Sequence, residues 1–386
     1  MPVPPPPPPP DEEDAEHMRR ALALAHRGWG QTAPNPMVGA VIVRDGVIVG
    51  EGFHARFGGP HAEVEALASA GERARGATAY VTLEPCAHHG KTPPCADALI
   101  AAGVRRVVCA VADPNPVASG GAARLRAAGV EVAIGVEEAV ARELNAPFFH
   151  AMVPGDRPWV TLKLAVSLDG AIAAAPGDEP PRGPVWLTGA ESRREVHRLR
   201  AGADAVAVGL GTVLADDPSL TVREWEAPRV APTRVVFDRA ARLPLGSTLA
   251  RTAREVPVVV LAERAAVSDA EGAARVGALR DWGVAVLVEE DLDAALRALR
   301  ARGARSLLVE GGAGVAGALL GRAAVDRLII FQAPLVLGAG AVGAFSRVPP
   351  RPVSDARRLP VIERRTFGDD LMTVYALPAS PVHRTG

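Results

Sequence analysis

The sequence has few of the residues that mark exported or nucleic-acid-binding proteins. Its 386 residues include only three cysteines, which favours a reducing compartment over a disulfide-rich secreted protein. Aromatic residues make up 4% and the formal net charge is -1, which disfavours the basic grooves and stacking platforms that hold nucleic acid. No unbroken stretch of about 18 apolar residues is present. We therefore expect a cytoplasmic protein that binds neither nucleic acid nor membranes.

Lysine is almost absent, because Lys91 and Lys163 are the only two in the chain. One explanation is a general bias towards arginine. The other is that these two positions need a compact, flexible ammonium group, beside a phosphate or a reacting oxygen, that a planar guanidinium cannot replace.

The length of the chain and the positions of its prolines predict two domains. At 386 residues the chain exceeds what one hydrophobic core usually organises. The proline tract Pro4–Pro10 and the acidic residues after it predict a disordered tail at 1–13. Prolines 147, 154 and 158 indicate a connection between a first domain at 14–147 and a second at 157–380.

Helices alternate with short strands in both halves, which predicts α/β domains. In the first half, Asp45-Gly46 between two β-branched runs predicts a hairpin. A helix is expected at residues 61–70. In the second half, the pattern predicts strands from Trp159 onwards and a last strand at 372–376 that closes an edge of the sheet.

The most informative residues are His61-Ala62-Glu63, Pro85-Cys86 and Cys95. One imidazole and two thiolates suit Zn²⁺ and leave its fourth position to water, whose pKa the metal lowers from about 16 towards 7. Glu63 is then free to carry protons. Zinc deaminases combine His-x-Glu with Pro-Cys-x-x-Cys, whereas here eight residues separate the cysteines. The sequence predicts a hydrolytic zinc deaminase with an unusual loop.

Two alternatives to this interpretation stay open. The zinc site is structural if His54, His88 or His89 supplies a fourth ligand, although Glu63 would then have no task. The chain is instead a deaminase of a nucleoside or an RNA base if its second half is only a binding module, which the near-neutral charge disfavours.

A glycine-rich segment marks the second half. Strand 307–309 runs into Glu310 and then into Gly312, Gly314 and Gly317, which match G-x-G-x-x-G before a helix. Backbone N–H groups at such a place can hold a pyrophosphate. No acidic residue follows at the distance typical of NAD sites, so a phosphorylated dinucleotide is favoured. A chance match in a chain with 39 glycines remains the alternative.

These motifs resemble the bifunctional riboflavin-biosynthesis deaminase/reductase family. The matching segments are Asn35–Gly39, His61–Glu63, Thr82–Cys95, Leu162–Gly170, Thr212–Arg223 and Val309–Gly312. The resemblance implies an α/β protein with an N-terminal three-layer cytidine-deaminase-like domain followed by a dihydrofolate-reductase-like α/β domain. It also implies two steps on one small pyrimidine ribotide, a zinc-dependent deamination and an NADPH-dependent reduction of the ribosyl side chain to ribityl.

The resemblance implies a role for individual residues. Glu63 is expected to be catalytic in the deaminase, and Lys163 and Glu310 in the reductase; the metal ligands are His61, Cys86 and Cys95. Substrate contacts are expected at Asn35, His54, His88 and Lys91 in the first site and at Arg200, Leu220, Arg223 and Glu310 in the second. NADPH contacts are expected at Ala165, Trp186, Thr212, Asp216, Gly312, Ala313, Gly314, Val315, Ala316 and Gly317.

Two positions depart from the family pattern. Pro184 stands where the family usually has a serine, and Arg239 stands where a small polar residue is common. They leave open an alternative in which only the deaminase is active and the second domain is impaired or accessory. A homo-oligomer is also left open.

Overall fold

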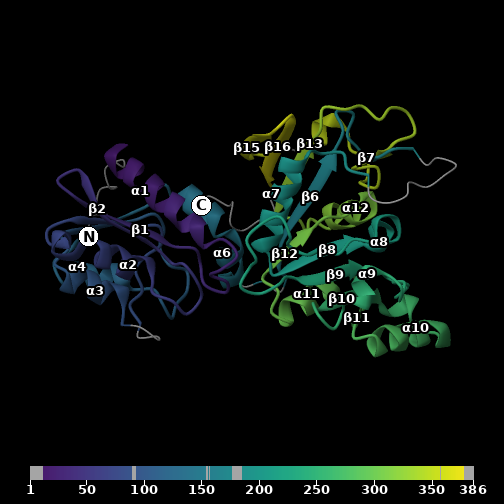
Figure 1. Cartoon of the computed structure of the whole chain (residues 1–386), viewed down its shortest axis with the longest axis horizontal. Coiled ribbons are helices and arrows are strands. Elements are labelled where there is room, and N and C mark those ends of the chain that lie inside the picture. Colours follow the sequence, from purple (N-terminus) through teal and green to yellow (C-terminus); the bar gives the residue numbers. More distant parts are fainter. Residues whose placement is uncertain are drawn as a thin grey trace. The chain divides into compact units, whose positions relative to one another are not determined.

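The computed structural model describes residues 12–88, 93–153, 155, 157–175, 185–356 and 358–377. The chain forms two compact units, Met1–Met152 and Val153–Gly386 (Figure 1). Most of the predicted tail, residues 1–11, lies outside the described residues. Among the described residues, no helix combines the length and the apolar character needed to span a bilayer.

The N-terminal unit is built on a five-stranded sheet in the order β2-β1-β3-β4-β5. The first pairs, β2 with β1 and β1 with β3, are antiparallel, and the remaining pairs are parallel. Positive φ angles of 51° at Asp45 and 74° at Gly46 form the tight turn of the predicted hairpin, which is confirmed. The strands are β1 (Gly39–Arg44), β2 (Val47–Phe53), β3 (Thr78–Val81), β4 (Arg106–Cys109) and β5 (Glu131–Ile134).

Helices cover both faces of this sheet and give three layers (Figure 1). On one face, Ala40 and Ile42 of β1 pack with α2 (Ala62–Ala70), α3 (Cys95–Ala101) and α4 (Gly121–Ala127). On the other face lies α1 (Glu12–Ala25), so close that a Cβ on Gly39 would stand 2.0 Å from the carbonyl oxygen of Ala21. The third cysteine, Cys109, is fully buried in this core.

Two boundaries of the first unit differ from the prediction. Helix α1 starts at Glu12, so the predicted tail was two residues too long; Glu12, Glu13 and Asp14 in its first turn are stabilised by the positive helix end. Where Pro147 indicated the start of a connection, α5 (Glu138–Leu144) is instead followed by α6 (Ala146–Met152). Pro147 lies in the first turn of α6, where its missing N–H costs no hydrogen bond.

The C-terminal unit is built on a nine-stranded sheet in the order β11-β10-β9-β8-β12-β6-β13-β16-β15. The pairs from β11 to β13 are parallel, whereas β16 is antiparallel to both of its neighbours. The strands are β6 (Trp159–Val166), β8 (Ala205–Gly209), β9 (Thr233–Phe237), β10 (Val258–Glu263), β11 (Ala285–Glu289), β12 (Ser306–Val309), β13 (Arg327–Gln332), β15 (Val361–Phe367) and β16 (Asp370–Ala376), with a separate pair β7 (Ala171–Ala173) and β14 (Val342–Gly343).

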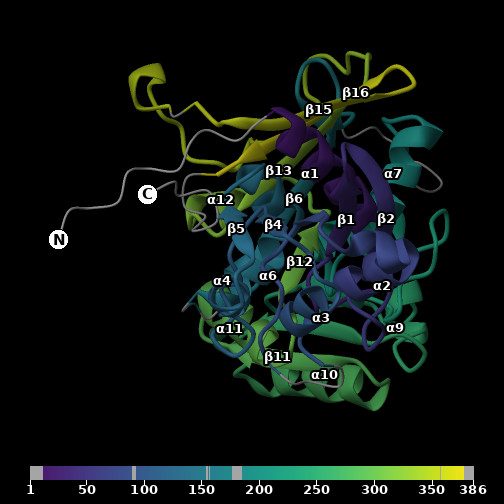
Figure 2. The same cartoon turned by 90° about the vertical axis from the view of Figure 1, so that its left-hand side faces the viewer.

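The predicted last strand does not close an edge, because β16 lies between β13 and β15. The β15–β16 hairpin is the yellow pair of strands in Figure 2. Strand β15 was missed because its residues are mostly exposed and include Glu363, Arg364 and Arg365, so it lacks the apolar alternation that marks a half-buried strand.

Alternate residues of the parallel strands point to opposite faces of this sheet. In β9, Val235 packs in the cluster that includes α11 (Leu292–Ala301) and α12 (Ala313–Gly321), whereas Val236 packs with α9 (Thr248–Arg251) and α10 (Ala270–Asp281). Helix α7 (Ala190–Ala201) contributes Val196 to a cluster with β13 and β16, and α8 (Leu210–Asp216) follows β8. The carboxyl ends of the parallel strands share one edge, where loop residues from distant parts of the chain can meet.

The close approach of β1 and α1 gives a testable prediction. Gly39→Ala should lower the free energy of unfolding of the N-terminal unit by about 3 kcal/mol, because the added Cβ overlaps the α1 backbone. Gly277→Ala in α10 is the control, since no atom lies within 4 Å of its added Cβ and it should be neutral or slightly stabilising. Calorimetric unfolding of both variants measures this; an unchanged transition in Gly39→Ala would contradict the packing.

Candidate active sites

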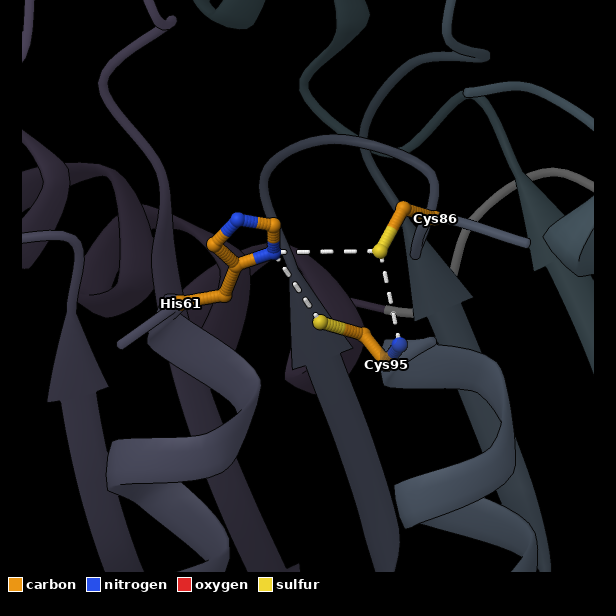
Figure 3. Close-up of side chains that lie close together, drawn as sticks. All are labelled: His61, Cys86 and Cys95. Atoms are coloured by element: carbon orange, nitrogen blue, oxygen red, sulfur yellow. Dashed lines mark hydrogen bonds between the residues drawn. The ribbon is translucent and has the colours of Figure 1, made fainter. Parts of the chain in front are cut away.

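The three predicted metal ligands converge in the N-terminal unit (Figure 3). His61 precedes α2, Cys95 is the first residue of α3, and Cys86 follows β3. The Nδ1 atom of His61 lies 3.2 Å from Cys95 Sγ and 3.8 Å from Cys86 Sγ, and all three ligand atoms lie within 4.8 Å of one another. A tetrahedral Zn²⁺ with its usual bond lengths requires nitrogen–sulfur separations of about 3.6 Å. The donors therefore fit zinc.

The two cysteines differ in how readily they lose a proton. Hydrogen bonding from Cys95, and from His61, lowers the pKa of Cys86 to about 4, and the backbone N–H of Cys95 donates to Cys86 Sγ at 3.4 Å. Hydrogen bonding to Cys86 and burial raise the pKa of Cys95. Without a metal, Cys95 therefore keeps its proton, which metal binding has to displace.

Glu63 lies beside the grouping of His61, Cys86 and Cys95 but is not part of it. It is the second residue of α2, only 4% exposed, and it lines a cavity of about 340 Å³ together with His61 and Cys86. Burial raises the pKa of Glu63. A carboxyl group that burial makes less acidic is suited to accept a proton from water and to pass it on.

The other histidines of the first site differ in their surroundings. His54 donates from Nδ1 to the carbonyl oxygen of Pro60 at 2.9 Å, and its Nε2 lies 3.2 Å from Asn35 Nδ2; burial lowers its pKa and keeps it neutral. His88 lines the cavity, and its Nδ1 has no partner among the described residues. His89 and Lys91 lie outside the described residues.

These positions bear on the structural-zinc alternative. Within the described part of the chain, His61, Cys86 and Cys95 are the only grouping of three or more potential ligands. Both ring nitrogens of His54 already have partners in the protein. Among the described residues no fourth side chain joins the grouping, so a zinc ion held by His61, Cys86 and Cys95 would keep one coordination position for water, as catalysis requires.

The cavity also contains residues that the sequence reasoning did not identify. Asp113 and Asn115 line it from the segment after β4, and Phe57 and Phe148 provide apolar side chains. The carboxyl ends of β3 and β4 meet at one sheet edge, so Asp113 was detectable as a polar residue after a buried strand. Phe148 carried no such signal, because it lies on α6, where the sequence indicated a connection.

Glu84 holds the segment after β4 in place. Its carboxylate accepts hydrogen bonds from the backbone N–H groups of Asp113, Gly120 and Ala122 at 3.1, 3.2 and 2.9 Å. Pro85 packs so tightly that a Cβ on Gly121 would lie 1.8 Å from its carbonyl oxygen. The segment that carries Cys86 is thereby fixed to the wall of the cavity.

The second predicted site brings three charged side chains together. Glu310, just after β12, pairs with Arg200 of α7 through contacts of 2.5 and 3.0 Å, and Lys163 of β6 lies 3.8 Å from it. Burial would raise the pKa of Glu310, but the two cations lower it to about 2. Glu310 therefore carries no proton at neutral pH. Burial lowers the pKa of Lys163, so of the two predicted catalytic residues, Lys163 is the one able to donate a proton.

The glycine-rich segment lies at the start of a helix, as an anion site requires. Gly312 precedes α12, and Thr212 lies in the first turn of α8. A Cβ on Gly312 would lie 4.0 Å from Thr212 Oγ1, so the two helix starts are close, and their N–H groups suit the phosphates of NADPH. In contrast, Ala316 N–H already donates to Gly312, and Gly317 packs against the backbone of Arg347.

The remaining predicted residues of the second site have varied surroundings. Arg223 donates its backbone N–H to His197 Nδ1 at 3.1 Å, and Arg200 donates to the carbonyl oxygen of Thr221. Leu220 is only 2% exposed as a whole residue, and its side chain packs in the core with Val208 and Val213. Trp186 is 62% exposed beneath Arg193, Asp216 is exposed, and Ala165 is half-buried.

The two departures from the family pattern have different outcomes. Pro184 lies outside the described residues. Arg239 forms an ion pair with Glu263, and its side chain is 80% exposed. This pairing gives Arg239 a surface role that does not involve the buried cluster around Glu310.

Comparison with known proteins matches a different family to each of the two units. Residues 11–111 match the cytidine and deoxycytidylate deaminase zinc-binding region, and residues 158–373 match the RibD C-terminal domain. Riboflavin biosynthesis protein RibD from Aquifex aeolicus is 41% identical over 94% of this chain and 98% of its own; the Escherichia coli protein of the same name is 43% identical over 93% and 98%.

Solved structures agree with this match. RibD from Acinetobacter baumannii is 39% identical, with a TM-score of 0.77 over 95% of this chain and 99% of its own. A deaminase/reductase from Thermotoga maritima is 36% identical, also with a TM-score of 0.77 over 95% and 99%.

Fold and sites together define a two-domain enzyme that joins a zinc-dependent cytidine-deaminase-like domain to an NADPH-dependent reductase. Its cofactors are Zn²⁺ and NADPH. More particularly, the chain belongs to the RibD family, the bifunctional deaminase/reductases of riboflavin biosynthesis.

The metal centre predicts how two variants differ. Cys95→Ser should reduce bound zinc to near zero, because the site loses one of three strong donors. Glu63→Gln should keep the wild-type zinc content, since Glu63 is outside the ligand cluster. Elemental analysis of the purified proteins measures this, and zinc loss in Glu63→Gln would show that the carboxylate is a ligand.

The buried charges of the second site predict a stability effect. Glu310→Gln should cost about 3–5 kcal/mol, because two buried cations lose their anion. Glu263→Gln, which breaks the exposed pair with Arg239, should cost less than about 1 kcal/mol. Chemical unfolding of both variants measures the difference.

The same cluster predicts a pH dependence. The folded-state pKa of Glu310 is depressed to about 2, below the value of about 4.3 expected in the unfolded chain. Its stabilising contribution is therefore complete above the unfolded pKa and is lost as pH falls through about 2. The stability gap between wild type and Glu310→Gln should persist from pH 7 to 5 and shrink below pH 4; a gap that stays constant in acid would contradict the ion-pair account.

Proposed function

We propose that the N-terminal domain deaminates 2,5-diamino-6-(5-phosphoribosylamino)pyrimidin-4-one and that the C-terminal domain then reduces the ribosyl side chain to ribityl with NADPH. The Thermotoga maritima relative is a diaminohydroxyphosphoribosylaminopyrimidine deaminase and 5-amino-6-(5-phosphoribosylamino)uracil reductase. The observation that carries the proposal is the open His61, Cys86 and Cys95 grouping beside a buried, unligated Glu63.

In the first step, bound zinc supplies a Lewis acid that lowers the pKa of water. Glu63 takes the proton that this water loses and delivers it to the ring nitrogen. It then carries the proton of the newly added hydroxyl to the departing amine, so that ammonia leaves and a carbonyl oxygen replaces the amino group. Asn35 and His88 are proposed to hold the pyrimidine in the cavity. Lys91 is proposed to bind the phosphate.

In the second step, NADPH supplies a hydride to C1 of the opened ribosyl chain. Lys163 protonates the ribose oxygen as the ring opens, and Glu310 keeps Lys163 charged despite its burial. Arg200, Arg223 and the backbone at Leu220 are proposed to face the substrate. Contacts to NADPH are proposed at Ala165, Trp186, Thr212, Asp216 and the start of α12, namely Gly312, Ala313, Gly314 and Val315.

We also propose a cytoplasmic location and a free small-molecule substrate. The location is supported by the chemistry of the zinc ligands, since Cys86 and Cys95 have to stay reduced to bind metal.

A two-step assay tests both activities. Wild-type protein should deaminate the diaminopyrimidine ribotide without NADPH and should form the ribityl product when NADPH is added, as identified by mass spectrometry. Deamination without reduction would favour the alternative in which the second domain is inactive. No reaction at all would contradict the proposal.

Matched variants assign the two steps to their sites. Glu63→Gln should lower deamination by about 10²–10⁴-fold, because it removes the proton carrier, and should leave reduction of the deaminated ribotide unchanged. Lys163→Met should show the opposite pattern. If one variant were to abolish both activities while staying folded, the division between the two domains would be wrong.

A further inference from the structure

Asn145 connects the end of the N-terminal unit to the rim of its cavity. Its Oδ1 accepts the backbone N–H of Met37 at 2.8 Å, and its Nδ2 donates to the carbonyl oxygen of Met37, also at 2.8 Å. The side chain is buried, with 4% of the residue exposed. A single carboxamide thus satisfies both backbone groups of a residue 108 positions earlier in the chain.

A series of contacts leads from Met37 to the metal ligands. Asn35, two residues before Met37, contacts His54 at 3.2 Å, and His54 donates to the carbonyl oxygen of Pro60, which precedes His61. The backbone N–H of His54 also donates to the carbonyl oxygen of Val38. The position of Met37 therefore determines where Asn35 and His54 stand in the cavity.

The chain that follows Asn145, at the start of α6, also forms part of the cavity wall. The carbonyl oxygen of Asn145 accepts the backbone N–H groups of Phe148 and Phe149 at 2.9 and 3.1 Å, which sets the first turn of α6. Phe148 lines the cavity together with Asn35 and Pro36. Asn145 thus holds two sides of the cavity at once, one through its backbone and one through its side chain.

Only a carboxamide provides one acceptor and one donor at this spacing. An aspartate has the same shape but presents two acceptors, so one oxygen would face the carbonyl oxygen of Met37. Glutamine keeps both groups on a longer stem. Aspartate therefore tests the loss of the donor at nearly constant volume, whereas glutamine tests a change of length with donor and acceptor both kept.

We propose that Asn145 is a positioning residue of the deaminase site, which acts by holding Asn35 and His54 through the backbone of Met37. The proposal rests on the deaminase function proposed above. It makes the helix at the end of the unit, α6, a part of that site rather than a connection to the next domain.

The experiment compares Asn145→Asp, Asn145→Gln and Tyr80→Phe in the full-length chain. Tyr80→Phe removes a hydrogen bond of 2.8 Å to Asp14, which is buried in the same unit and does not line the cavity. Deaminase kcat and KM, zinc content, reductase turnover with the deaminated ribotide, and thermal stability are measured for each variant.

Asn145→Asp should lower deaminase kcat/KM by about 10- to 100-fold, because a small displacement of binding groups has a large effect on rate. Zinc content and reductase turnover should stay at wild-type levels, and Asn145→Gln should recover part of the activity. Tyr80→Phe should lower stability and leave deaminase kcat/KM unchanged.

The proposal is overturned if Asn145→Asp deaminates like wild type or loses activity only in proportion to its zinc or folded fraction. It is also overturned if Tyr80→Phe shows the same loss. If Asn145→Asp does not fold, Asn145→Gln decides alone: a lower kcat/KM than Tyr80→Phe supports the proposal, and an equal value overturns it. An inactive wild type would instead reject the deaminase function itself.

Discussion

The first site depends on one geometric constraint, that an imidazole and two thiolates must stand a few ångströms apart around a single ion. The fold meets it by placing His61 and Cys95 at the starts of two helices and Cys86 in the segment between them in sequence. The backbone N–H of Cys95, at the start of α3, donates to Cys86 Sγ, so this placement favours the thiolate form of Cys86.

Hydrogen bonds to backbone groups give the metal site its rigidity. Glu84 satisfies three N–H groups of the neighbouring segment, and Asn145 satisfies both groups of Met37. Neither side chain has to touch the substrate to matter, because a buried polar group left without its partner costs more free energy than a typical hydrogen bond contributes. The cavity is therefore shaped both by Glu84, which lines it, and by Asn145, which does not.

The second site is governed by charge burial. Lys163 and Arg200 are both largely removed from water, and Glu310 is the anion that makes their burial tolerable. This arrangement distinguishes Lys163 from Glu310, the two residues that the family resemblance implies to be catalytic. A carboxylate held between two cations stays ionised, whereas burial lowers the pKa of the lysine and makes its proton easier to transfer.

The amino-acid sequence by itself determined the two α/β halves and the hairpin at Asp45-Gly46, and it predicted the grouping of His61, Cys86 and Cys95 that the structure contains, because turn chemistry and ligand type are local properties of the chain. It also indicated the helix start at Gly312. It did not reveal β15, whose polar residues carry no strand pattern, or α6, where Pro147 looked like a break. Only the tertiary structure decided that Asn145 reaches Met37, that both nitrogens of His54 are occupied, and that Arg200 holds Glu310. These pairings join residues far apart in sequence, and their energies depend on burial and on the exact partner, neither of which a linear pattern contains.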